Sequence, residues 1–131
     1  MPAGARHRHF EAYCQSKLAN VLFTQELAER LARTPVTVNS LHPGFVPNTN
    51  LVRKFPLGNF ALRMLGYVPG FTTPEEGART IVYLAASPEV ATTTGKYFTE
   101  RRERRVSRHA QDRELQKRLW EVSADLVGLG N

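Results

Sequence analysis

A change in hydrophobic period near residue 35 limits the folds open to this chain. Over residues 11–33, apolar side chains recur at spacings of three and four: Leu18, Val21, Leu22, Leu27 and Leu31. This is the period of an amphipathic helix. Pro35 ends the helix because the residue before a proline avoids helical angles. Residues 36–41 then alternate β-branched and polar side chains, which predicts a strand ended by a His-Pro-Gly sequence.

A second helix is predicted from local chemistry after Thr73. The Thr73 side chain can cap the helix, Pro74 suits the first helical position, and Glu76 completes a capping box. Ser87-Pro88 ends it. We expect four residues to form its apolar face: Ala78, Ile81, Val82 and Ala85.

Residues 95–100 predict a second strand, and residues 112–127 predict a last helix, with Gly128 at the C-cap. The inner side of this helix should carry Leu115, Leu119, Trp120, Ser123, Leu126 and Val127. The order is helix, strand, loop, helix, strand, helix, which predicts an α/β fold with parallel strands. We expect the strand at 36–41 to pair with the strand at 95–100.

Length and composition fit one folded domain of 131 residues, of which 41% are hydrophobic. The single cysteine excludes an internal disulfide and a cysteine-rich metal site, and it fits a reducing compartment. The first ten residues are polar and basic, and no run reaches the ~18 apolar residues of a membrane span. We therefore expect a cytoplasmic protein without a membrane span.

The net charge of +6 is concentrated in "RRERRVSRH", residues 101–109, where five of nine residues are arginine. Such a run can attract phosphate or nucleic acid. It can equally be a solvated loop between two elements. No aromatic residues interleave with the arginines to stack on bases, so we favour the solvated loop and expect no nucleic-acid partner.

Tyr13 and Lys17, in "YCQSKLAN", are four residues apart on the first predicted helix. Residues at this spacing lie on one helix face, so a phenol and an ammonium share the same space. A free phenol has a pKa of about 10, and a cation within about 4–6 Å favours its ionised form. Such a tyrosine can donate a proton to a carbonyl or accept one from an alcohol. The same pair also occurs by chance on ordinary surface helices.

Several blocks of the chain resemble the short-chain dehydrogenase/reductase family. "FEAYCQSKLANVLFTQEL" is similar to the catalytic helix of its retinol-dehydrogenase-like and WW-domain-oxidoreductase-like members. "VTVNSLHPG" resembles the strand and Pro-Gly turn that follow, and "GKYF" and "RLWEVSADLVG" resemble the last strand and helix. The resemblance runs from Phe10 to Leu129. It implies the C-terminal part of a doubly wound, Rossmann-type parallel sheet.

The resemblance also implies roles for individual residues. Tyr13 would be the catalytic acid/base, and Lys17 would lower its pKa and bind the nicotinamide ribose. Contacts to an NAD or NADP cofactor would come from Tyr13, Lys17, Pro43, Gly44, Phe45, Val46 and Thr49. Thr49 stands about one residue later than the commonest family spacing, so Asn48 is an alternative to it. The subfamily favours NADP.

Residues 45–72 would form a substrate lid, and their aromatic content suggests an apolar carbonyl or alcohol substrate, with ordinary packing as the alternative. The chain shows no glycine-rich cofactor turn and no serine before Tyr13 where the family carries its catalytic serine. We therefore expect residues 1–131 to be a C-terminal fragment of a single family domain, inactive alone and marginally stable. The alternative is a non-catalytic domain that at most forms a homodimer through helix 11–33.

Overall fold

The computed structural model describes residues 3–44 and 73–129, with side chains from residue 11 onward. The chain divides into two compact units. The first unit comprises residues 1–40, 93–97 and 105–131, and the second comprises residues 41–92 and 98–104. No helix among the described ranges is long and apolar enough to cross a membrane.

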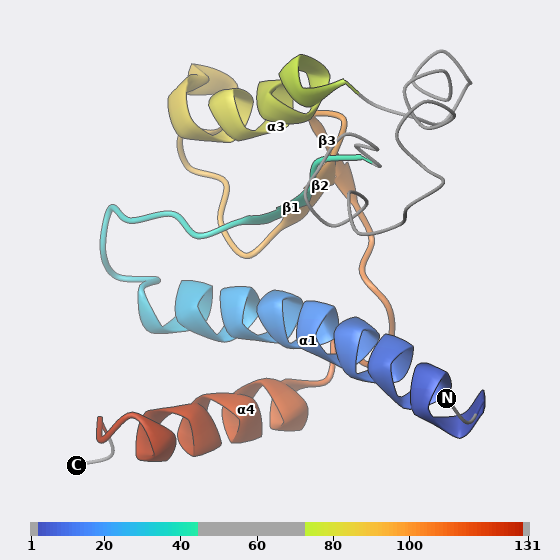
Figure 1. Cartoon of the computed structure of the whole chain (residues 1–131). Helices are drawn as coiled ribbons and strands as arrows, with labels where there is room; N and C mark the ends of the chain where they lie inside the picture. Colours follow the sequence, from blue (N-terminus) through green and yellow to red (C-terminus); the bar gives the residue numbers. More distant parts are fainter. Residues whose placement is uncertain (1–2, 45–72, 130–131) are drawn as a thin grey trace. The chain divides into compact units, whose positions relative to one another are not determined.

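Two helices, α1 (Ala3–Arg30) and α4 (Arg113–Leu126), lie side by side in the first unit (Figure 1). The first predicted helix is confirmed, but it begins earlier and ends three residues before residue 33. A turn follows Arg30, where the Thr34 hydroxyl donates to the Leu31 carbonyl at 2.8 Å and accepts the Val36 N–H at 3.3 Å. These bonds direct the chain out of the helix just before Pro35.

The contact between α1 and α4 combines aromatic and polar groups. The rings of Phe23 and Trp120 stack with centroids 5.4 Å apart, and the Arg30 guanidinium lies 4.4 Å from the centre of the Trp120 ring. Gln116 is only 1% exposed. Its amide donates to the Gln25 side chain at 2.5 Å and to the Ala110 carbonyl at 2.8 Å. The helix pair is therefore joined by a hydrogen-bonded glutamine as well as by apolar burial.

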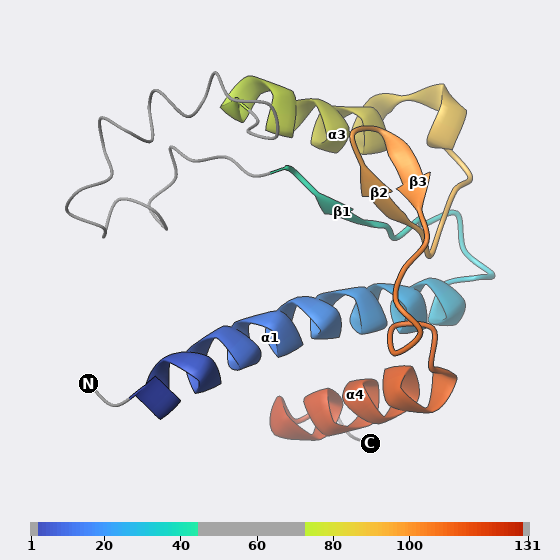
Figure 2. The same cartoon turned by 90° about the vertical axis from the view of Figure 1, so that its right-hand side faces the viewer.

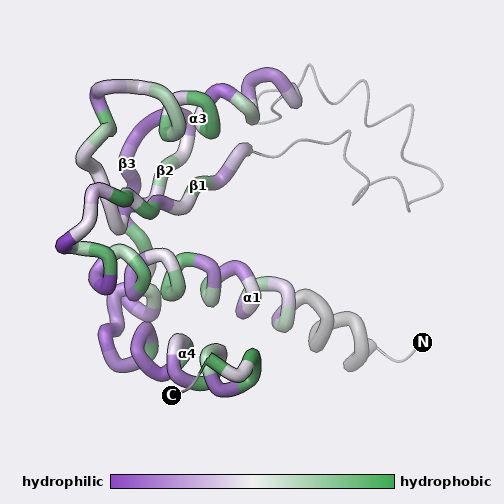
Figure 3. Tube along the Cα trace, turned by 90° about the vertical axis from the view of Figure 1, so that its left-hand side faces the viewer, coloured by the Kyte–Doolittle hydropathy of each residue, from purple (hydrophilic) through white to green (hydrophobic). Residues whose placement is uncertain are grey.

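The predicted inner side of α4 is partly wrong. Leu119, Trp120 and Ser123 are half-buried, but Leu126 and Val127 are 81% and 69% exposed. These two residues stand at the C-terminal end of the helix, where no described residue covers them. Figure 3 shows hydrophobic and hydrophilic stretches alternating along α4. Both ends agree with the prediction, because Asp112 caps the first turn and Gly128 follows with a φ of 72°.

The sheet has three strands in the order β1 (Ser40–His42), β2 (Tyr97–Thr99) and β3 (Arg102–Arg104). The Gly95 N–H donates to the Val38 carbonyl, and the Ser40 N–H donates to the Lys96 carbonyl. The pairing thus advances in the same direction along both chain segments, so β1 and β2 are parallel. This confirms the predicted pairing and the α/β fold class.

The first strand is shorter than predicted, because residues 36–39 are held mainly by side chains. The Val38 N–H donates to the Thr94 hydroxyl at 3.0 Å. The Asn39 amide donates to the Thr93 carbonyl at 2.7 Å and accepts the Lys96 N–H at 3.0 Å. Asn39 thus replaces regular strand hydrogen bonds in this stretch.

The sequence predicted a solvated loop for the arginine-rich segment 101–109. The structure instead begins this segment with a turn and a strand. Glu100 and Arg101 have φ angles of 51° and 61°, and they form a two-residue turn between β2 and β3. Left-handed angles at both central residues match the twist of an antiparallel hairpin. The first arginines after the turn therefore lie on a strand, although their side chains are exposed as expected.

Helix α3 (Pro74–Ala86) belongs to the second unit, and Figure 2 shows it running along the sheet. The predicted cap is confirmed, because the Thr73 hydroxyl accepts the Glu76 N–H at 3.2 Å. A short 3-10 helix, η1 (Pro88–Val90), follows.

The predicted buried face of α3 is wrong. Ile81 and Val82 are 53% and 61% exposed, whereas Gly77 and Thr80 are buried. Both buried positions are therefore held by small residues. The core of this unit also holds Val90 and Phe98, and Tyr83 packs edge-on against Phe98 with centroids 6.5 Å apart.

Candidate functional site

Tyr13 and Lys17 lie one turn apart on α1, within the exposed stretch 11–17. The Lys17 ammonium is 5.4 Å from the centre of the Tyr13 ring. This juxtaposition is the one that the spacing of four predicts. The Ser16 hydroxyl donates to the Tyr13 carbonyl at 2.7 Å, within the same turn. The helix therefore holds the phenol and the ammonium on one face.

The Tyr13 side chain is accessible to solvent. Tyr13 is 47% exposed, and within the described part of the chain its hydroxyl has no hydrogen-bond partner. The Lys17 ammonium over the ring is attracted by the negative face of the aromatic system. The catalytic roles of Tyr13 and Lys17 stay predictions.

The Pro43-Gly44 turn directly follows β1, in the second unit. The Gly44 N–H donates to Nδ1 of His42 at 2.9 Å, and Gly44 has a φ of 84°. This left-handed angle favours glycine, which has no Cβ. The imidazole of His42 therefore closes the turn, which agrees with the structural role that a histidine at a strand end most often has.

The remaining predicted cofactor contacts, Phe45, Val46 and Thr49, lie outside the described residues. The same holds for Asn48 and for the whole predicted lid at 45–72. Among the residues that are described, no group of three or more His, Cys, Asp or Glu side chains could hold a metal ion.

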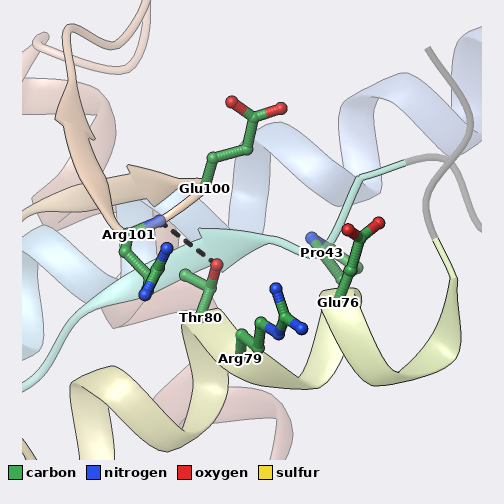
Figure 4. Close-up of a pocket in the computed structure, with 6 residues that line it drawn as sticks. All are labelled: Pro43, Glu76, Arg79, Thr80, Glu100 and Arg101. Atoms are coloured by element: carbon green, nitrogen blue, oxygen red, sulfur yellow. Dashed lines mark hydrogen bonds between the residues drawn. The ribbon is translucent and has the colours of Figure 1, made fainter. Parts of the chain in front are cut away.

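A pocket of about 170 Å³ opens in the second unit beside the Pro-Gly turn (Figure 4). It is lined by Pro43, Glu76, Arg79, Thr80, Glu100 and Arg101. No motif in the sequence includes Arg79, and Arg101 stands in the sequence only as part of a basic run. No sequence signal links the two, because they are brought together by α3 and the β2–β3 turn.

Comparisons with known proteins identify the chain's relatives. Residues 2–58 match the family model for short chain dehydrogenase. Retinol dehydrogenase 14 from Homo sapiens is 46% identical over 119 residues, which cover 89% of this chain and 35% of that protein. Retinol dehydrogenase 13 from Mus musculus is 47% identical over 124 residues, covering 90% of this chain and 36% of that protein. The chain belongs to the short-chain dehydrogenase/reductase family.

This short-chain dehydrogenase/reductase chain spans about a third of the length of the curated relatives it matches. Every predicted site residue falls inside the matched segment 2–58. The open, partly parallel three-stranded sheet fits part of a Rossmann-type fold, as the resemblance implied. The family is one of oxidoreductases that use NAD or NADP and act on small molecules.

Proposed function

We propose that the protein takes part in hydride transfer between NADP or NAD and an apolar carbonyl or alcohol substrate. Tyr13 would be the acid/base. The observation that carries the proposal is the Tyr13–Lys17 pair. Its ammonium stands 5.4 Å from the ring centre, and it lies in the segment that matches the family model. NADP is the first cofactor to test, because the sequence resembles an NADP-preferring subfamily.

Two residues of the matched segment 2–58, Lys17 and Gly44, are proposed to contact the nicotinamide part of the cofactor. Gly44 presents backbone without a Cβ, and Lys17 offers an exposed ammonium to a ribose hydroxyl. Further contacts are proposed for Pro43, Phe45, Val46 and Thr49. When bound, the cofactor supplies or accepts the hydride.

The chemistry of the chain itself is proton transfer. During reduction, the Tyr13 hydroxyl would give its proton to the substrate oxygen, and the Lys17 ammonium would stabilise the resulting phenolate. During oxidation, the phenolate would take the alcohol proton. The names of the relatives point to retinal and retinol as first substrates to try, and we place the reaction in the cytoplasm.

We propose that the 131 residues alone are inactive, because the sequence contains no glycine-rich turn to hold a pyrophosphate. The test therefore uses a chimaera in which residues 10–129 replace the matching segment of human retinol dehydrogenase 14. The chimaera should reduce retinal with NADPH, followed by absorbance at the cofactor's wavelength.

In that chimaera, Tyr13→Phe should lower kcat by roughly 10²–10⁴-fold, the usual contribution of general acid–base catalysis. Tyr97→Phe removes a hydroxyl from β2 and is the matched control. Equal activity of Tyr13→Phe and the control would exclude Tyr13 as the acid/base. Activity of the isolated chain would exclude the proposed need for a cofactor half.

A second proposal is a non-catalytic domain that dimerises through α1. It is favoured by the aromatic side chains that α1 exposes, since Tyr13 and Phe23 are 47% and 43% exposed. Sedimentation of the isolated chain tests it. A monomer at every concentration would exclude the dimerising domain.

A further inference from the structure

We propose that the pocket beside the Pro-Gly turn binds a phosphate-type oxyanion through Arg79 and Arg101. We name it the Arg79–Arg101 pocket. It lies wholly within the second unit, and its walls come from three segments far apart in sequence: the turn after β1, the N-terminal half of α3 and the β2–β3 turn. The pocket shares Pro43 with the proposed cofactor contacts, but the inference does not rest on the oxidoreductase function.

The anion-binding groups of the pocket are its two guanidinium groups, those of Arg79 and Arg101. Neither Arg79 nor Arg101 forms an ion pair with any residue in the described ranges. Two carboxylates, those of Glu76 and Glu100, also line the pocket. Figure 4 shows the Glu100 carboxylate directed away from both guanidinium groups. The two arginines are therefore left with planar donor groups that no carboxylate occupies.

The backbone at Arg101 is held in place for this role. Arg101 has a left-handed φ of 61°, and its N–H donates to the Thr80 hydroxyl at 3.2 Å. Thr80 is only 3% exposed, so this bond ties the turn to the buried side of α3. The hairpin geometry and this bond together fix the backbone of Arg101 beside the pocket.

The size and donor geometry of the pocket fit a small tetrahedral oxyanion. Arginine presents a rigid fork of N–H donors that matches phosphate oxygens in pairs. A volume of about 170 Å³ holds one phosphate group with a few waters. A nucleotide could supply the same group as free phosphate does, so the experiment compares both sources.

The test is an NMR titration of the full 131-residue chain with inorganic phosphate, at ionic strength held constant with chloride. We expect saturable shifts of the Thr80 and Arg101 amide signals. Arg79→Gln should weaken binding by at least about tenfold, the effect of losing a charged hydrogen bond. Arg101→Asn should do the same, and asparagine tolerates the left-handed angle of that turn.

Arg104→Gln is the matched control, because Arg104 is exposed on β3 and does not line the pocket. Its affinity for phosphate should equal that of the unchanged chain. Shifts that never saturate, or an equal loss in Arg104→Gln, would overturn the proposal. A parallel titration with adenosine diphosphate identifies the source: tighter binding than phosphate indicates a nucleotide, and equal or weaker binding indicates free phosphate.

Discussion

The pKa of the Tyr83 phenol is shifted by desolvation and by two charged neighbours, Glu89 and Arg101. Its hydroxyl donates to Oε2 of Glu89 at 3.1 Å. Desolvation raises the pKa of Tyr83 above its ordinary value of 10.0, and the hydrogen bond and charge of Glu89 raise it further, while Arg101 acts in the opposite direction. Because the pKa is higher in the folded state, the neutral phenol contributes stability below pH 10.0, and this contribution is lost as pH rises through the folded pKa.

Replacing Glu89 by glutamine should therefore lower the pKa of Tyr83 toward 10.0. The substitution removes the negative charge and keeps a neutral acceptor. The loss of stability in alkali should begin at a lower pH than in the unchanged chain. Phenolate absorbance against pH measures the effect. Glu75→Gln serves as the control, because Glu75 lies on α3 together with Tyr83. If both substitutions shifted the pKa of Tyr83 equally, the role assigned to Glu89 would be contradicted.

At the scale of whole elements, the α1–α4 pair depends on one buried polar residue. Gln116 accepts from the Arg113 guanidinium at 2.9 Å, in addition to donating to Gln25 and to the Ala110 carbonyl. A buried hydrogen-bonding group that loses its partner retains the full penalty of desolvation. Substituting Gln116 should therefore cost more stability than the small apolar surface of its side chain would suggest.

Gln116→Ala should reduce the free energy of unfolding by about 1–3 kcal/mol, because the Ala110 carbonyl loses its partner. Chemical denaturation followed by circular dichroism measures this change. Gln111→Ala provides the comparison, since Gln111 is exposed and its side-chain amide donates to the Val106 carbonyl. It should reduce stability by less than half as much. Similar losses in both variants would show that burial of Gln116 does not matter.

A second prediction concerns the approach of Gly95 to α1. Gly95 has a φ of 71°, and a Cβ added there would stand 3.4 Å from the Cβ of Ala28. Gly95→Ala should therefore combine the left-handed penalty of about 1–2 kcal/mol with a tight contact. Gly128→Ala carries the same type of angle, 72°, with nothing within 4 Å. Thermal unfolding should show the larger loss for Gly95→Ala, and the reverse order would contradict the packing described.

What the sequence predicted correctly is local chemistry. The cap at Thr73 and the end at Gly128 were readable because they depend on neighbouring residues. The spacing of four likewise placed Lys17 over the ring of Tyr13. Contacts between distant segments were not readable. Arg79 and Arg101 share a pocket because a turn with left-handed angles brings the hairpin against α3. The turn was not predicted, because neither of its two residues is a glycine.

At the scale of the whole molecule, both ends of the sheet order are open among the described residues. β1 pairs only with β2, so its other edge has no strand beside it there. The apolar residues Ile81 and Val82 on α3 are also more than half exposed. Unpaired strand edges and exposed apolar side chains both favour association between chains.

We therefore expect marginal stability for the isolated chain, with a broad thermal transition centred below about 45 °C, the lower limit for ordinary domains. Differential scanning calorimetry over a range of protein concentrations measures it. Apparent aggregation should increase with concentration. A sharp transition at high temperature, unchanged by dilution, would contradict the prediction.

The turn between β2 and β3 consists of two residues, Glu100 and Arg101, so its length cannot vary without changing the pairing of the strands. Along β3, the side chains of Arg102 and Arg104 point to one side and that of Glu103 to the other. One inserted residue would slip the register and exchange these sides. The surface that now carries two guanidinium groups would then present a carboxylate, so the electrostatic sign of this rim is encoded in the length of the bend.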